Sequence, residues 1–423
     1  MFSKFLKPEK QFEILSSGVV DFIQKKELLK KLKEKRALRV KVGFDPSRPD
    51  IHLGHSVLLN KLRQFQDLGH KVIFVVGDFT ACIGDPSGQN KTRPLLSEKE
   101  ARRNARTYIE QVTQKNFENP KDIDMKTTHL LNFLKRLNIK KTKILYNSKW
   151  LDKLPLRKFI IEIMSKLTVA RQLERNDFAQ RYKSEKSIGL HEFFYPALQA
   201  YDSLEIKADV ELGGTDQLFN LLLGRELQEH FNQVPQCVLT LPLLEGVDGV
   251  QKMSKSLGNA ISFNDLPRDI YGKIMKISDK LLNKYWSLLT QGSCDLDKEI
   301  NKKKLHPKSQ KELLAESIVY SLHGEKAAQE AKKEFVQIFS KKGTPTDIKQ
   351  KIVKPAQDVW ICSFIKEVGL SSSTSEARRS ILAGALKKDG QKLTNAQEKI
   401  NLKSGDSFIL NSGKRKFIKI KVK

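Results

Sequence analysis

The chain has 423 residues, which is enough for two or three domains with a sizeable hydrophobic core. Its 77 lysines and arginines against 49 acidic residues give a net charge of +28, which favours a polyanionic partner such as RNA, although a lysine-rich genome would produce part of the same excess. The sequence has no long apolar run, at its start or elsewhere, which argues against secretion and membrane spanning. Four cysteines without paired spacing favour a reducing cytoplasm: Cys82, Cys237, Cys294 and Cys362.

The first informative pattern is a strand, a loop, a helix and a second strand between residues 38 and 76. Residues 38–44 alternate apolar and polar side chains, and residues 72–76 form a second apolar run. Between them, apolar residues recur at helical spacing from Leu53 until Gly69 supplies a stop. This order predicts a parallel crossover, and open parallel sheets bind ligands at the carboxyl ends of such strands.

His52 and His55 are expected in the first turn of that helix, where backbone N–H groups and the helix dipole favour anions. Neutral imidazoles there suit hydrogen bonding to phosphate. Gly54, between them, permits a base or phosphate to approach the backbone closely. A metal pair is the alternative, but the scattered cysteines do not support it, and no metal ligand is predicted.

Tyr195, Gln199 and Asp202 stand at i, i+4 and i+7 of a predicted helix, so they share one face and can line one pocket. A merely solvated polar stripe is the alternative. The segment Lys252-Met253-Ser254-Lys255-Ser256 is a compact cationic loop that suits a polyphosphate, and its alternative is an ordinary solvated loop of a basic protein.

Towards the C-terminus, residues 266–339 have a mostly helical pattern, and a polar, proline-punctuated boundary follows. Residues 359–369 and 375–384 then predict two helices, and short strands are expected around 408–410 and 417–420. Residues 354–423 contain 15 basic and 6 acidic side chains. This excess favours RNA binding by a small separate module.

His52-Leu53-Gly54-His55, followed much later by the Lys252–Ser256 loop, resembles the paired signature of the class I aminoacyl-tRNA synthetases. Residues 83–88, 195–202 and 213–217 narrow the resemblance to the bacterial tyrosyl-tRNA synthetase family, over essentially the whole chain. The C-terminal residues are similar to an RNA-binding module first recognised in a small-subunit ribosomal protein.

The resemblance implies an α/β fold with a doubly wound parallel sheet. It implies a Rossmann-type catalytic domain over 1–265 with an inserted dimerisation segment at about 119–186. A helical anticodon-side domain (266–345), a linker (346–357) and the RNA-binding module (358–423) would follow.

The resemblance also implies the reaction of a tyrosine–tRNA ligase in the cytoplasm. Tyrosine and ATP, with Mg²⁺, would give tyrosyl-adenylate and pyrophosphate, and tyrosine would then pass to tRNA(Tyr) on a homodimeric enzyme. The implied catalytic residues are Ser47, His52, His55, Lys252 and Lys255. The implied ATP-binding residues are Asp45, Gly54, Arg93, Asp216, Lys252 and Lys255. The implied tyrosine-binding residues are Lys41, Asp85, Tyr195, Gln199, Asp202 and Gln217. The implied RNA-binding residues are Arg378, Arg379, Lys387 and Lys388.

Two positions depart from the family pattern. Lys41 stands where many members have a tyrosine that contacts the substrate hydroxyl, and it either takes that role or contacts another pocket group. Gln89 stands where many members have a phosphate-binding lysine, so Arg93 is assigned only by its position. Three other functions compete: a tryptophanyl-tRNA synthetase, a small-molecule nucleotidyltransferase and an RNA-binding regulator without catalysis.

Overall fold

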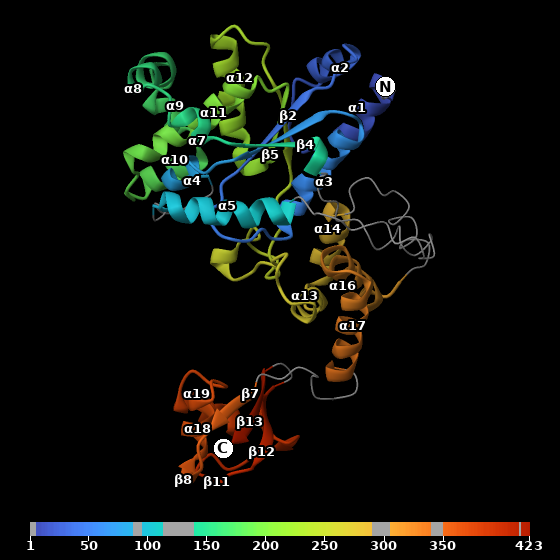
Figure 1. The fold of residues 1–423 in the computed structure, drawn as a ribbon, viewed down its shortest axis with the longest axis vertical. Helices are drawn as coiled ribbons and strands as arrows, with labels where there is room; N and C mark the ends of the chain where they lie inside the picture. The colour runs from blue at the N-terminus through green and yellow to red at the C-terminus, as the bar shows by residue number, and fades with distance from the viewer. Residues whose placement is uncertain (1–5, 88–94, 113–138, 290–304, 340–349, 414–415) are drawn as a thin grey trace. The chain divides into compact units, whose positions relative to one another are not determined.

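The computed structural model describes residues 6–87, 95–112, 139–289, 305–339, 350–413 and 416–423. It separates into two compact units, Met1–Ala328 and Gln329–Lys423, each of which is described by itself (Figure 1). In the part of the chain that the structure describes, no helix combines the length and apolarity needed to cross a bilayer.

The first unit is built on a six-stranded sheet with the strand order β1-β6-β5-β2-β3-β4. All neighbouring strands are parallel except the edge strand β1, which pairs antiparallel with β6. The α/β fold with a mainly parallel sheet is the expected one. The strands are β1 (Phe22–Ile23), β2 (Arg39–Phe44), β3 (Lys71–Val76), β4 (Thr142–Tyr146), β5 (Val210–Gly214) and β6 (Cys237–Leu241).

The predicted crossover consists of β2, helix α3 (Gly54–Asp67) and β3, and it is confirmed. Helix α3 ends where Gly69 takes a φ of 91°, a conformation that residues with a side chain rarely adopt. His52 and His55 were both expected in the first turn of this helix. His55 lies there, but His52 lies two residues before the helix, so the expectation for His52 was wrong.

Two helices cover opposite faces of the sheet centre. On one face, Lys41 of β2 reaches residues of α11 (Phe194–Ile206), and its neighbour Ile73 packs with Ile206 of that helix. Successive residues of a strand point to opposite faces of the sheet. Phe44 of β2 therefore points to the face opposite Lys41, where it packs against His55 of α3. Helix α11 also packs along α12 (Leu218–His230) (Figure 1).

Other helices of this unit surround the sheet. They are α1 (Pro8–Ser16), α2 (Lys25–Lys33), α4 (Thr80–Ile83), α5 (Glu98–Val112), α7 (Ser148–Leu151), α8 (Leu156–Lys158), α9 (Val169–Leu173) and α10 (Asn176–Lys183). Strand β4 falls inside the range 119–186 that the sequence assigned to an inserted dimerisation segment. Because β4 pairs with β3 in the main sheet, this part of the range belongs to the sheet itself.

The helical pattern expected after residue 266 is confirmed in the described residues. Helix α13 packs on α16, and α14 contacts α3, which joins these helices to the sheet domain. The boundary between the two units falls within α17. The helices are α13 (Pro267–Met275), α14 (Asp279–Leu289), α16 (Pro307–His323) and α17 (Glu325–Phe339).

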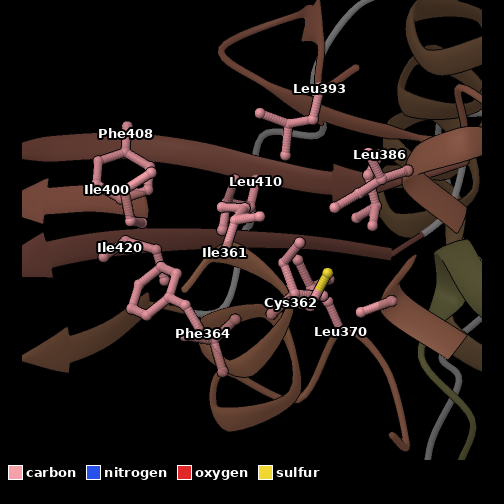
Figure 2. Packing of buried hydrophobic residues seen from close by; sticks show 14 of the residues in the cluster. Ile361, Cys362, Phe364, Leu370, Leu386, Leu393, Ile400, Phe408, Leu410 and Ile420 are labelled. Atoms are coloured by element: carbon pink, nitrogen blue, oxygen red, sulfur yellow. The ribbon is translucent and has the colours of Figure 1, made fainter. Parts of the chain in front are cut away.

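Beyond its part of α17, the second unit contains in its described residues a five-stranded sheet of order β10-β9-β12-β13-β7, a two-stranded ribbon of β8 and β11, and the helices α18 and α19. Its core joins residues such as Phe364 of the first helix to Leu410 and Ile420 of the central strands (Figure 2). The elements are β7 (Gln350–Val353), β8 (Ala356–Trp360), α18 (Ile361–Glu367), α19 (Thr374–Leu382), β9 (Leu386–Lys388), β10 (Gln391–Lys392), β11 (Lys399–Leu402), β12 (Ser407–Ser412) and β13 (Lys416–Val422).

Both predicted helices and both predicted strands are therefore present in this unit. The predicted linker, 346–357, differs from the structure, because β7 lies within it and pairs in parallel with β13. Only Val353 of β7 is buried, so the sequence carries too weak an alternation to reveal a strand there.

Candidate active site

A cleft of about 1720 Å³ opens at the carboxyl ends of β2, β3, β5 and β6, the edge at which a ligand site was predicted. Of the fifteen residues predicted for catalysis or substrate binding, thirteen line the cleft: Asp45, Ser47, His52, Gly54, His55, Asp85, Tyr195, Gln199, Asp202, Asp216, Gln217, Lys252 and Lys255. Lys41 lies behind the cleft wall. Arg93 and Gln89 lie outside the described residues.

His52 and His55 form a close pair just before and inside the first turn of α3. Their ring centroids are 3.9 Å apart, and His55 Nδ1 lies 3.1 Å from the backbone nitrogen of His52. Burial lowers the pKa of His55 to about 4 and places the pKa of His52 well below its ordinary value. Both imidazoles are therefore neutral at pH 7, as the sequence predicts for hydrogen bonding to phosphate.

Gly54 is required by the packing of this pair. A Cβ atom at Gly54 would lie 3.0 Å from both Cε1 and Nδ1 of the His52 ring, and 3.6 Å from Cβ of Met253. A Cβ atom at this position would thus require the His52 ring to shift slightly, whereas its distance to Met253 is an ordinary contact.

Backbone hydrogen bonds join the histidine segment to residues 261–263, which follow the cationic loop. Leu53 N donates to Ile261 O at 2.8 Å, and Phe263 N donates to Ile51 O at 3.2 Å. An isolated antiparallel bridge between His52 and Ser262 lies between them. The histidine segment is therefore held against the residues that follow the cationic loop.

Each lysine of the loop pairs with an acid of the cleft. Lys252 Nζ is 2.8 Å from Asp216 Oδ2, and Lys255 Nζ is 2.5 Å from Asp50 Oδ2. Gly258, with a φ of 68°, ends the short 3₁₀ turn η6 (Lys255–Leu257). Sequence reasoning missed Asp50 as a cleft residue, although its place two residues before His52 could have indicated it.

Tyr195, Gln199 and Asp202 line the cleft from one face of α11, as their spacing predicts. Tyr195 Oη donates to Asp45 Oδ2 at 2.8 Å. Gln199 Oε1 accepts from Nδ2 of Asn220 at 3.0 Å. The face of the helix thus presents a hydroxyl, an amide and a carboxylate in a row.

Asp202 is the most deeply buried acid of the cleft wall, with 4% of its surface exposed. It accepts hydrogen bonds from Trp150 Nε1 at 2.7 Å and from Asn147 Nδ2 at 3.3 Å. Burial raises the pKa of Asp202 to about 6, against the opposing effects of Lys41 and of these two donors. Sequence reasoning missed Trp150 and Asn147, which follow β4, a strand that it did not identify.

Lys41 is fully buried and takes no part in lining the cleft. Its Nζ lies 2.8 Å from Glu211 Oε1, and it donates to Ser203 Oγ at 2.7 Å and to Gln199 O at 3.0 Å. This placement favours the second of the two roles considered for Lys41, contact with other pocket groups.

Asp85 and Gln217 meet at the other wall of the cleft. Gln217 Nε2 donates to Asp85 Oδ2 at 2.8 Å, and Ser87 N donates to Asp85 Oδ1, also at 2.8 Å. Among the described residues, no three His, Cys, Asp or Glu side chains form a group suited to a metal ion.

The four residues expected to bind RNA lie in the second unit. Arg378 and Arg379 are exposed on α19, while Lys387 and Lys388 are half-buried on β9. Lys388 Nζ lies 4.4 Å from the centroid of the Phe408 ring, which holds its charge near the sheet. The helix and strand follow each other directly through Gly384, so the four cations belong to one short stretch of backbone.

Comparisons with known proteins place the chain in a family. Residues 33–340 match the family model described as tRNA synthetases class I (W and Y). A tyrosine–tRNA ligase of Bdellovibrio bacteriovorus is 46% identical over 426 residues, which cover 99% of this chain and 100% of the relative. A tyrosine–tRNA ligase of Thermotoga maritima is 46% identical over 417 residues, which cover 98% of each chain.

Solved structures show the same fold. A C-terminally truncated mitochondrial tyrosyl-tRNA synthetase of Aspergillus nidulans superposes with a TM-score of 0.61 at 18% identity, over 78% of this chain and 99% of that one. A tyrosyl-tRNA synthetase of Archaeoglobus fulgidus, complexed with L-tyrosine, gives a TM-score of 0.57 at 22% identity, over 77% and 99% of the two chains. The chain therefore belongs to the class I tRNA synthetases, in the family of the tryptophan and tyrosine enzymes.

Proposed function

We propose that the chain is a tyrosine–tRNA ligase, which activates tyrosine with ATP and transfers it to tRNA(Tyr). The observation that carries the proposal is the cleft that has Asp202 buried in its wall and Lys252 and Lys255 at its edge. The eight curated relatives compared are all named tyrosine–tRNA ligase and are 43–46% identical over nearly the whole chain.

The tyrosine subsite follows from the chemistry of its walls. A phenol hydroxyl that donates to Asp202 satisfies a buried carboxylate, whereas a phenylalanine ring would leave that carboxylate without a partner on the substrate side. Tyr195, Gln199 and Asp85 offer oxygen acceptors for the ammonium group. Gln217 offers an N–H to the carboxylate.

The ATP subsite lies between the two signature segments. The neutral His52 and His55, with Ser47, donate to phosphate oxygens, and Gly54 leaves room for the nucleoside. Asp216 accepts from the ribose. Asp45 and Arg93 complete the predicted set, although Arg93 lies outside the described residues.

Activation is an in-line displacement at phosphorus. An oxygen of the tyrosine carboxylate forms a bond to the α-phosphorus, the bond to the bridging oxygen of the β-phosphate breaks, and pyrophosphate leaves with that electron pair. Lys252 and Lys255 stabilise the charge that develops on the leaving group. Mg²⁺ would accompany ATP and be held chiefly by phosphate oxygens.

Transfer to RNA is the second step. A terminal ribose hydroxyl of the tRNA attacks the carbonyl of tyrosyl-adenylate, an ester bond forms, and AMP leaves. The exposed Arg378 and Arg379, with Lys387 and Lys388, would bind phosphates of the tRNA from the second unit.

The enzyme would act as a homodimer in the cytoplasm. Support for the dimer comes from large apolar side chains that are more than half exposed in and beside the predicted dimerisation segment: Leu156, Ile160, Ile161, Val169 and Leu190.

The decisive assay is amino-acid-dependent exchange between ATP and pyrophosphate. Tyrosine should support exchange, and tryptophan should not. Exchange with tryptophan alone would change the substrate to tryptophan, and no exchange with any amino acid would favour an RNA-binding regulator. A chain that ends after Phe339 should keep the exchange and charge tRNA poorly, and equal losses of both activities would contradict a separate RNA-binding role for the second unit.

A further inference from the structure

A chain of hydrogen bonds links a buried arginine outside the cleft to two amides inside it. Arg175 Nη1 donates to Asn220 Oδ1 at 2.7 Å. Asn220 Nδ2 then donates to Gln199 Oε1 at 3.0 Å and to Gln217 Oε1 at 3.2 Å. Gln199 and Gln217 line the cleft, whereas Arg175 and Asn220 do not.

The direction of every bond in this chain is fixed by its charged ends. A guanidinium group only donates hydrogen bonds, and an ionised carboxylate only accepts them. Arg175 therefore requires the oxygen of Asn220 to face it, so that the amide nitrogen of Asn220 faces the two glutamines. Both glutamines must then turn their oxygens towards Asn220.

The far ends of the chain require the same orientation. Gln217 Nε2 donates to Asp85 Oδ2 at 2.8 Å, and Gln199 Nε2 lies 3.5 Å from Glu211 Oε1. All the bonds thus run from one cation to two carboxylates, and bonds that run in one direction polarise and strengthen one another. An isolated amide has no such preference, because its oxygen and nitrogen ends have almost the same shape.

Arg175 is itself held rigidly at the start of α10. Asp177 accepts from its Nε at 3.1 Å and from its Nη2 at 2.7 Å, and the aromatic rings of Phe178 and Phe219 lie 4.9 and 5.3 Å from its guanidinium carbon. Nη2 also donates to Ser87 Oγ at 3.1 Å, two residues from Asp85. Arg175 is 5% exposed, so water does not compete for these contacts.

We propose that Arg175, acting through Asn220, is a positioning residue that sets which ends of Gln199 and Gln217 meet tyrosine. In the orientation set by Arg175, Gln217 keeps its NH₂ group for Asp85 and the substrate carboxylate, and Gln199 keeps its oxygen for the substrate ammonium group. The opposite orientation would put the Gln217 oxygen against Asp85 and against the substrate carboxylate, which repels both. This inference rests on the proposed tyrosine activation and names residues that act behind the cleft wall.

The test compares the parent enzyme with Asn220→Asp, Arg175→Met and Arg175→Lys in tyrosine-dependent ATP–pyrophosphate exchange. Asn220→Asp has the same shape as the parent residue but cannot donate to the glutamines. We expect Asn220→Asp and Arg175→Met to raise the KM for tyrosine roughly ten-fold or more, as for a lost hydrogen bond to a charged group. The KM for ATP should change less than two-fold. Arg175→Lys keeps a group that only donates, so its effect should be smaller than that of Arg175→Met.

Arg181→Met is the matched control. Arg181 lies on α10, is 1% exposed and forms a two-bond ion pair with Glu192, which is not a member of the hydrogen-bond chain from Arg175. This variant should lower the melting temperature without changing the ratio of the two KM values. Combining Asn220→Asp with Arg175→Met should give the same KM for tyrosine as Asn220→Asp alone, because the two residues act in series.

Each outcome has one reading. An unchanged KM for tyrosine in folded Asn220→Asp or folded Arg175→Met overturns the inference. The inference is also overturned if the KM values for tyrosine and ATP rise together in these variants and Arg181→Met has the same effect. If Arg175→Met does not fold, Asn220→Asp decides, since its side chain keeps the parent shape beside Arg175. Absence of tyrosine-dependent exchange in the parent enzyme contradicts the proposed function instead, so the two failures are distinguishable.

Discussion

Replacing Asp202 by asparagine should make the enzyme more stable above neutral pH and less able to bind tyrosine. Burial raises the pKa of Asp202 from 3.8 to about 6. A carboxyl group whose pKa is raised by folding stabilises the folded state in its protonated form, and that stability is lost as pH rises from the unfolded to the folded pKa. Two units at about 1.4 kcal/mol each give a cost of about 3 kcal/mol at pH 8.

Asparagine has the same shape and carries no charge, so it removes this cost. Part of the gain is offset, because both Trp150 and Asn147 donate to Asp202, and the NH₂ group of asparagine would face one of them at a cost of about 1 kcal/mol. The expected net gain at pH 8 is about 1–2 kcal/mol. About half of the cost of ionising buried Asp202 is already present at pH 5. The difference in free energy of unfolding between variant and parent should therefore grow by roughly 1.4 kcal/mol from pH 5 to pH 8.

Urea unfolding at a series of pH values measures this difference, and titration calorimetry measures tyrosine affinity. Asp209→Asn is a control of opposite sign, because Asp209 is also buried but pairs with Arg36, which helps to hold its pKa below the usual value. That variant should be less stable than the parent at every pH from 5 to 8. An Asp202→Asn variant that is less stable than the parent at pH 8, or whose difference does not change with pH, would refute the reasoning.

Three further predictions concern other parts of the molecule. Lys41→Met leaves Glu211 buried without its cation and should lower the free energy of unfolding, measured in urea, by about 3–5 kcal/mol. Adding Glu211→Gln should restore part of this stability, and a loss below about 1 kcal/mol in Lys41→Met would contradict a buried ion pair. Gly54→Ala should lower the rate of ATP–pyrophosphate exchange roughly ten-fold by displacing His52, with little change in melting temperature because alanine suits a helix start; a wild-type rate would show that His52 tolerates the shift. Phe364→Ala should destabilise the second unit by about 3–5 kcal/mol and reduce tRNA charging while the exchange reaction is retained, and loss of exchange would contradict the independence of the two units.

The sequence predicted those parts of the site whose signals are local. The strand, loop, helix and strand around His52 follow from alternation and from the stop at Gly69, and the shared face of Tyr195, Gln199 and Asp202 follows from helical geometry. The placement of these residues in one cleft follows from the rule that parallel strands bind ligands at their carboxyl ends.

The parts that the sequence did not predict depend on contacts between distant segments. Alternation in residues 38–44 suggested a half-buried strand, but β2 is central and covered on both faces, so Lys41 is buried and needs Glu211 from β5. The residues 142–146 that form β4 sit in a lysine-rich context without clear alternation, and Asn147 and Trp150 were missed with them. The hydrogen-bond chain from Arg175 joins residues that are far apart in the sequence, and no spacing rule indicates it.

In the proposed reaction, the pairing of both loop lysines with cleft acids would make phosphate binding an exchange of counterions. Lys252 and Lys255 are each held by a carboxylate that is itself partly exposed, with 20% and 29% of the side chain of Asp216 and Asp50 accessible. When a polyphosphate draws the ammonium groups away, water can solvate both carboxylates, so neither is left as a buried unpaired charge. Release of pyrophosphate returns each lysine to its acid. In the proposed reaction, Asp216 and Asp50 would thus replace pyrophosphate as partners of the two lysines, which would favour release of the product.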